Sequence, residues 1–149
     1  MNSTMDHISV DMLRTCEKCG REGRACHSQC WYNGMDEPRT SMSFSCGHCG
    51  AAVEEDGTGL TEEERLLFYR QYGIWELRLD CPEGSDMKLA RSLQDVLGAS
   101  AREALLYLKG KNAEWSRGTP VEVECLRGKL AAKGVPAVVA EAVPPTEAT

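Results

Sequence analysis

Long hydrophobic runs are missing from this chain of 149 residues, and none approaches the ~20 apolar residues that span a bilayer. The segment Met1–Val10 has neither a basic start nor an apolar centre, which argues against a secretory signal. We therefore expect a cytoplasmic protein without a membrane partner. The formal net charge is −6 and the pI is about 5.1, which disfavours charge-driven binding to nucleic acid.

Recognisable catalytic motifs are also missing. The sequence has no phosphate loop, no dinucleotide fingerprint and no Ser-His-Asp pattern. Its three histidines are His7, His27 and His48, and none of them has a glutamate two residues later, as the His-x-Glu pattern of zinc deaminases requires. The sequence therefore favours a protein that is not an enzyme.

Cysteine is the residue in which the chain is rich. Six of the eight cysteines lie between Cys16 and Cys49, whereas Cys81 and Cys125 stand alone. Because clustered cysteines in a reducing compartment bind metal more often than they pair, the cluster indicates a metal site. We expect the two isolated cysteines to be small buried residues.

Two Cys-x-x-Cys-Gly units carry the strongest signal. They are Cys16-Glu-Lys-Cys19-Gly20 and Cys46-Gly-His-Cys49-Gly50. Each unit can form a tight knuckle in which the glycine accepts a positive φ, and four thiolates complete the closed tetrahedron of structural zinc. The pattern resembles a zinc ribbon over roughly residues 14–52, in which residues 42–45 form a strand. The cofactor expected from it is zinc, held by Cys16, Cys19, Cys46 and Cys49.

The loop between the knuckles leaves two alternatives open. Cys26, Cys30 and His27 could hold a second metal ion or compete with the knuckles for the first. Alternatively, a helical turn places both thiols on one face beneath Trp31, and this interpretation is favoured. We expect His48 to point outward and His7 to lie on the surface.

The chain divides into four parts. Residues 1–55 form the zinc-ribbon domain, and residues 56–73 a connecting loop and helix. We predict a polar loop over 54–59, across the boundary with the ribbon domain. We also predict a helix over 61–72, because Thr61 and Glu64 form a capping box and Gly73 suits a helix stop. Residues 74–141 form a second domain, and 142–149 a flexible tail.

The second domain has a mixed α+β pattern. We predict strands over 74–79 and 135–140, helices over 86–97, 101–108 and 120–133, and a short strand over 113–117. Ser100 and Thr119 are the expected helix caps. The predicted core of this domain consists of Trp75, Leu77, Leu79, Leu89, Leu93, Val96, Leu105, Leu126 and Leu130.

This half of the chain resembles the C-terminal domain of the bacterial ribosomal stalk protein. The resemblance rests on Leu97-Gly98, on Arg102-Glu103-Ala104 with Leu108, and on Thr119-Pro120 through Leu130 to Lys133-Gly134-Val135. It implies a compact β-α-α-β-α-β fold and places Arg102 on the face that binds elongation factors in that family. Residues 74–149 are near charge balance and Ser100 replaces a family glycine, so we expect a different partner surface.

The function expected from these features is that of a non-enzymatic zinc-binding protein that works through protein–protein contacts. Because the chain is acidic, its partner should be a basic protein. An immunity protein that neutralises a toxin fits, as does an adaptor to translation or proteolysis machinery. The alternatives are a ribosome- or nucleic-acid-associated zinc-ribbon factor and, last, a zinc-dependent enzyme. Candidate partner contacts are Trp31, Tyr32 and Arg102.

Overall fold

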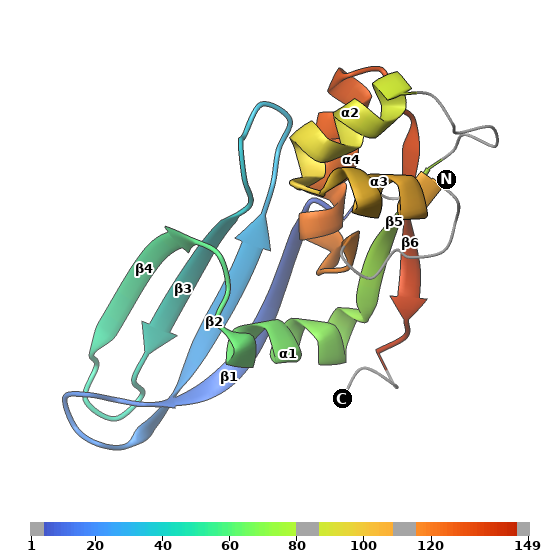
Figure 1. The fold of residues 1–149 in the computed structure, drawn as a ribbon. Helices are drawn as coiled ribbons and strands as arrows, with labels where there is room; N and C mark the ends of the chain where they lie inside the picture. The colour runs from blue at the N-terminus through green and yellow to red at the C-terminus, as the bar shows by residue number, and fades with distance from the viewer. Residues whose placement is uncertain (1–4, 80–86, 109–115, 146–149) are drawn as a thin grey trace.

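A computed structural model describes residues 5–79, 87–108 and 116–145 of the chain. It has a mixed α+β fold with a four-stranded sheet, a two-stranded sheet and four helices in these residues (Figure 1). Cys81, Trp115 and most of the predicted strand over 113–117 lie outside the described residues. Directly after that segment, Gly118 forms an isolated β-bridge with Trp75.

The four-stranded sheet is an antiparallel meander in the order β1-β2-β3-β4. Its strands are β1 His7–Thr15, β2 Glu22–Cys30, β3 Arg39–Ser45 and β4 Ala52–Thr58. The strand before the second knuckle is confirmed, but the predicted loop over 54–59 is wrong because residues 54–58 belong to β4. Acidic residues have a low preference for strands, so this segment is held by backbone pairing with β3 and carries no hydrophobic pattern of its own.

The predicted helical turn at Cys26–Cys30 is also wrong, because both cysteines belong to β2. Side chains alternate between the two faces of a strand, and in β2 the residues of one face are the more buried. Gly23, Ala25 and Gln29 are buried on that face, and the sheet continues it with Ile8 and Val10 of β1.

Helix α1, Glu62–Tyr72, follows the sheet and matches its prediction closely. The Thr61 hydroxyl accepts the amide of Glu64, and the Glu64 side chain accepts the amide of Thr61, which completes the capping box. The helix stops at Gly73, whose φ of 85° is unfavourable for a residue with a side chain.

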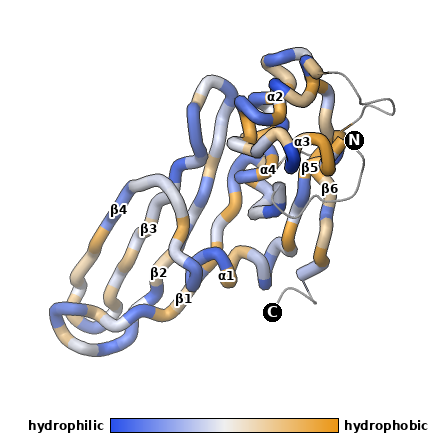
Figure 2. Tube along the Cα trace, viewed as in Figure 1, coloured by the Kyte–Doolittle hydropathy of each residue, from blue (hydrophilic) through white to orange (hydrophobic). Residues whose placement is uncertain are grey.

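The second half of the chain contains β5 Ile74–Leu79, α2 Met87–Leu97, α3 Ala101–Leu108, α4 Pro120–Ala132 and β6 Ala137–Val143. Strands β5 and β6 pair antiparallel, and in Figure 2 hydrophobic residues follow β6 and α3. The caps predicted at Ser100 and Thr119 are confirmed by their bonds to Glu103 and Glu122. The strand predicted over 135–140 lies two to three residues later in the structure, because β6 extends to Val143.

The core of this half has eight buried residues: Leu77, Leu89, Leu93, Ala104, Tyr107, Val123, Leu130 and Val135. Trp75, Leu79, Val96 and Leu126 pack around them as predicted. The prediction for Leu105 is wrong, since this side chain is 52% exposed on α3.

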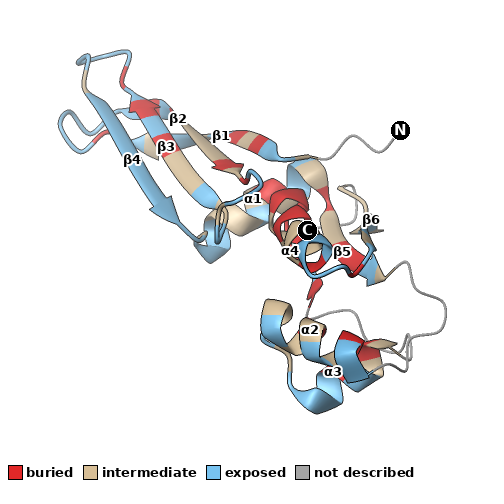
Figure 3. Cartoon of the chain, turned by 90° about the horizontal axis from the view of Figure 1, so that it is seen from above, coloured by how far each residue is buried: buried red, intermediate tan, exposed pale blue. Residues whose placement is uncertain are grey.

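A separate core joins the two halves of the chain. Ile8 and Val10 of β1, Trp31, Phe68 of α1, and Val121 and Cys125 of α4 form it, and all six are buried. Helix α4 therefore has one apolar face toward this joint and another toward the β5–β6 core. Figure 3 shows buried residues along α4, at the start of β1 and at the end of β2, whereas β4 is exposed throughout.

The contact between Trp31 and Gly128 of α4 gives a test of this joint. A Cβ atom at position 128 would lie 2.2 Å from the Trp31 ring. We expect Gly128→Ala to lower the free energy of unfolding by about 1–3 kcal/mol through overpacking, although alanine is the better helix former. Gly47→Ala is the control, because its Cβ meets no atom within 4 Å, and should change stability by less than about 0.5 kcal/mol. Equal denaturation midpoints for the two variants would contradict the packing described here.

Candidate metal centre

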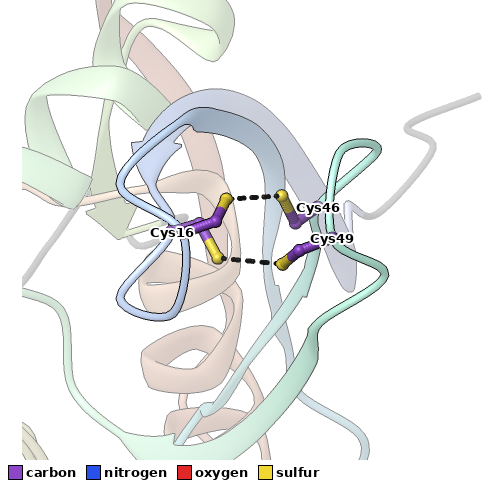
Figure 4. Close-up of side chains that lie close together, drawn as sticks. Cys16, Cys46 and Cys49 are labelled. Atoms are coloured by element: carbon purple, nitrogen blue, oxygen red, sulfur yellow. Dashed lines mark hydrogen bonds between the residues drawn. The ribbon is translucent and has the colours of Figure 1, made fainter.

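The two cysteine knuckles lie at the same end of the four-stranded sheet. The first connects β1 to β2 and the second connects β3 to β4, and β1 and β3 run in the same direction because both pair antiparallel with β2. Both knuckles therefore lie at the same end of the sheet, where β1 and β3 end. Figure 4 shows Cys16, Cys46 and Cys49 pointing toward one another from these two loops.

The knuckles have nearly the same backbone geometry. In the first, Gly20 donates its amide to the Cys16 carbonyl at 2.8 Å, and in the second Gly50 donates to the Cys46 carbonyl at 3.0 Å. Both glycines have a φ of 76°. The expectation that each glycine supplies a positive φ is confirmed, and the sequence spacing translates into two matching turns.

The sulfur positions suit a tetrahedral metal ion. The Cys16 and Cys49 sulfurs are 3.7 Å apart, those of Cys19 and Cys46 are 3.6 Å apart, and all four lie within 4.8 Å of one another. A tetrahedron with metal–sulfur bonds of ~2.3 Å has edges of about 3.8 Å. The four cysteines could therefore hold one metal ion, as the sequence predicts.

Backbone amides prepare two of the thiols to become thiolates. The amides of Cys19 and Lys18 lower the pKa of Cys16, and those of Cys49 and His48 lower the pKa of Cys46 to about 6. The Arg21 amide acts in the same direction on Cys19, but desolvation and the neighbouring thiols outweigh it and raise that pKa to about 12. Four thiolates this close repel one another, so a cation is needed to hold them together.

A small core lies beneath the metal centre. Cys16 and Cys46 are buried there with Ala25, Met42 and Phe44, while Cys19 and Cys49 are exposed. The Phe44 ring lies over Gly23, where a Cβ would come within 2.7 Å of it. This core has few aliphatic residues, so the end of the sheet depends strongly on the four cysteines.

The structure separates the residues of the second metal hypothesis. Cys26 and Cys30 share one face of β2, but four residues of strand set them about 13 Å apart. His27 lies on the opposite face, where its Nδ1 is 3.2 Å from Oε2 of Glu64 and its Nε2 is buried without a hydrogen-bond partner. The three residues therefore cannot share an ion. Among the described residues, the only group of ligands close enough for a metal is the four knuckle cysteines.

The cysteines and histidines outside the centre have other surroundings. Cys26 lies beside Asp11, and burial together with this carboxylate raises its pKa. Burial also raises the pKa of Cys125, which is 3% exposed, as expected for a packed cysteine. His48 is exposed on the second knuckle, 3.2 Å from an Arg21 nitrogen, and His7 is exposed on β1.

The predicted partner contacts differ in exposure. Trp31 is 5% exposed, and its indole N–H donates to the Met35 carbonyl at 2.9 Å, so it belongs to the joint between the halves and not to a free surface. Tyr32 is 53% exposed, and Arg102 is exposed on α3. Only Tyr32 and Arg102 remain available to a partner.

Sequence reasoning missed a polar network that links three elements. The buried Thr119 hydroxyl caps α4 and also donates to the Gln29 side chain of β2 at 2.6 Å. Glu122, which completes this cap, accepts two hydrogen bonds from Arg65 of α1, and this contact raises the pKa of the guanidinium. The Thr-x-x-Glu patterns at 61 and 119 were visible in the sequence, but their long-range partners were not.

Comparison of the chain with protein-family models, with curated proteins and with solved structures found no match. In the described residues, the helices are too short or too polar to cross a membrane.

The geometry predicts which cysteines matter for metal content. The purified protein should bind about one ion per chain, and Cys16→Ser or Cys46→Ser should abolish stoichiometric binding, because each removes one corner of the tetrahedron. Cys26→Ser and Cys30→Ser, which keep the four corners, are the matched controls and should retain the ion. Elemental analysis of the four variants measures this, and two ions per wild-type chain, or metal loss in Cys26→Ser, would contradict the assignment.

Proposed function

We propose that the protein is a non-enzymatic zinc-binding protein that acts through protein–protein contacts. The observation that supports this most strongly is the set of four thiols at tetrahedral spacing. Four protein ligands fill the coordination sphere of zinc, whereas catalytic zinc keeps a position for water or substrate. The ion would therefore stabilise a fold and not perform a reaction.

Zinc is the metal that this ligand set favours. Tetrahedral sulfur sites bind zinc or iron, and of these two we propose zinc, because two Cys-x-x-Cys units that supply four thiolates form the closed ligand set of structural zinc sites. The absorption spectrum separates the two metals, because an iron–thiolate site is coloured and a zinc site is not. We assign the centre to zinc on the basis of this ligand chemistry.

The charge distribution supports a basic protein as the partner. Residues 1–73 contain seven basic and twelve acidic side chains, so they carry −5 of the total −6. Complementary charge accelerates association and selects partners. An immunity protein that neutralises a basic toxin, or an adaptor to translation or proteolysis machinery, would use such a surface.

Charge and metal coordination count against the two alternative functions. A ribosome- or nucleic-acid-associated factor needs cations that neutralise phosphates, and the acidic excess of the ribbon half opposes this. A zinc-dependent enzyme needs an open ligand position beside a general base. His48 is the nearest histidine along the chain, but it contacts Arg21 on the surface.

Removal of the metal should unfold the knuckle end of the four-stranded sheet, with β3 and β4, before the rest of the protein. The core beneath the knuckles is small, and zinc binding contributes directly to folding in such sites. We expect a strong chelator to expose the amides of β3 and β4 to hydrogen exchange. Amides of α2 and α4 should stay protected, and added zinc should restore the sheet. A chelated protein with unchanged exchange throughout would contradict a structural role.

The partner proposal is tested by capture from the native host, followed by direct titration. A basic protein should be retained with the zinc-loaded chain, and its affinity should fall as salt rises. If the captured partner is toxic to cells that express it, and co-expression of the present chain protects those cells, the chain is an immunity protein. Retention of a ribosomal or protease component would instead identify an adaptor. Filter binding at low salt is the counter-test, because tight nucleic-acid binding would overturn the proposal.

A further inference from the structure

The two edges of the four-stranded sheet are treated differently by the fold. At the β1 edge, the Tyr72 hydroxyl of α1 accepts the Ser9 amide at 3.1 Å and donates to the Ser9 carbonyl at 3.0 Å. Gln71 donates to the same carbonyl at 3.4 Å. Helix α1 therefore occupies the outward backbone groups of this edge at Ser9.

The β4 edge has no such cover. All seven residues of Ala52–Thr58 are exposed, and even Val53, on the side of the sheet that faces the helices, is 41% exposed. Proteins usually protect an open edge with a bulge, a proline or charged side chains. Strand β4 pairs with β3 without a register shift and contains no proline, so its protection consists of acidic side chains alone.

The hydrogen-bonding pattern shows which backbone groups of β4 face outward. Cys46 donates its amide to the Ala51 carbonyl, so residues 46 and 51 form a hydrogen-bonded pair. Antiparallel pairs alternate between bonded and non-bonded. Counted from the bonded pair 46–51, Ser43–Glu54 and Ser41–Asp56 are three and five positions along the register and therefore do not bond to each other. The amides and carbonyls of Glu54 and Asp56 point away from the sheet and are available to an added strand.

The acidic side chains of β4 are not compensated by the protein. Glu54 and Asp56 lie opposite Ser43 and Ser41, and Glu55 lies opposite Met42. None of the ion pairs among the described residues involves these three carboxylates. They are also not grouped as metal ligands, since consecutive strand residues point to opposite faces.

We propose that the β4 edge is the surface that receives the basic partner, through addition of an extended segment as a fifth strand. The outward amides and carbonyls of Glu54 and Asp56 would hydrogen-bond to that segment. Lysine or arginine at two alternate positions would lie directly opposite their carboxylates, and main-chain bonds would supply affinity while these pairs supply specificity. This inference rests on the proposed function and names its binding surface.

The same charges oppose pairing of β4 with a second copy of this chain. Two β4 strands side by side would bring Glu54, Glu55 and Asp56 next to the same residues, and like charges opposite each other destabilise a sheet. The acidic edge therefore disfavours pairing with a second β4 strand and favours pairing with a basic strand. Light scattering provides the check, since a dimer that dissociates on Asp56→Lys would assign the edge to a second copy and overturn the proposal.

The test uses a capped seven-residue peptide in which lysine alternates with valine, titrated into the zinc-loaded full chain at low salt. We expect Glu54→Gln with Asp56→Asn to weaken binding roughly five- to tenfold. The charge-matched control, Glu62→Gln with Glu63→Gln on α1, removes two exposed carboxylates elsewhere and should stay within about twofold of the wild type. Equal losses in both double variants, or no binding of the peptide to the wild type, would overturn the proposal.

A second pair of variants separates strand addition from simple charge attraction. Glu54→Pro and Glu54→Gln lose the same charge, but only the proline also removes the outward amide, and proline is tolerated at a sheet edge. Strand addition requires the proline variant to bind several-fold more weakly than the glutamine variant. Equal binding by the two, at one zinc per chain in each, would reduce the site to unspecific attraction and refute strand addition.

Hydrogen exchange reports the geometry directly. In the free protein the amides of Glu54 and Asp56 should exchange fast, whereas Val53 and Glu55 should be protected by β3, and the peptide should protect the first two. If the peptide does not protect these two amides while the metal content is unchanged, only the proposal for the β4 edge is refuted. The proposed function would fail separately, if the native partner of the zinc-loaded chain proved not to be a basic protein.

Discussion

The fold depends on helix α4 being buried on two sides. Val121, Cys125 and Gly128 recur at helical spacing on the face that meets β1, Trp31 and α1, while Val123 and Leu130 lie on the face toward β5. A helix with apolar residues on two faces is stable in water only if both are covered. Because two different layers supply the cover, the four-stranded sheet and the β5–β6 half are joined by a shared buried core. The glycine at position 128 is required at the closest approach, where the Trp31 ring occupies the space of a side chain.

The polar contacts of the joint extend the helix caps into tertiary structure. Each of the caps at Thr61 and Thr119 uses a glutamate in the third helical position, and each glutamate has a further partner beyond its own helix. Glu64 reaches His27 of β2, and Glu122 reaches Arg65 of α1. A bidentate carboxylate–guanidinium contact of this kind fixes orientation as well as distance. The caps that begin the helices therefore also fix their position against the sheet, and the His27 ring is held by the start of α1 and takes no part in a metal site.

The sequence predicts those parts of the structure whose causes are local. The four helices follow from caps, glycine stops and helical spacing, and the four metal ligands follow from two identical short motifs, so all of these could be inferred residue by residue. Strands β2 and β4 could not, because Cys26 to Cys30 and Glu54 to Thr58 carry no alternating apolar pattern and become strands only through pairing with their neighbours. Leu105 belongs to the same class of error, since helical spacing identifies an apolar face but not how much of it is covered. The link between Gln29 and Thr119 spans 90 residues of sequence, and no local pattern encodes it.

The metal centre lies directly before β4 in the chain, and β4 has few other contacts that fix its position. Strand β4 buries none of its residues, so its position is fixed by backbone bonds to β3 and by the second knuckle, which begins at Cys46 and ends two residues before β4. Hydrogen bonds on an exposed strand contribute only about 0.5–1.5 kcal/mol each, and an isolated hairpin is marginally stable in water. The knuckle that holds the ion is therefore the main constraint that keeps β4 in an extended, pairing-competent form. Binding of a strand at β4 and binding of a metal at the knuckles favour the same ordered hairpin, and two ligands that order the same element increase each other's affinity.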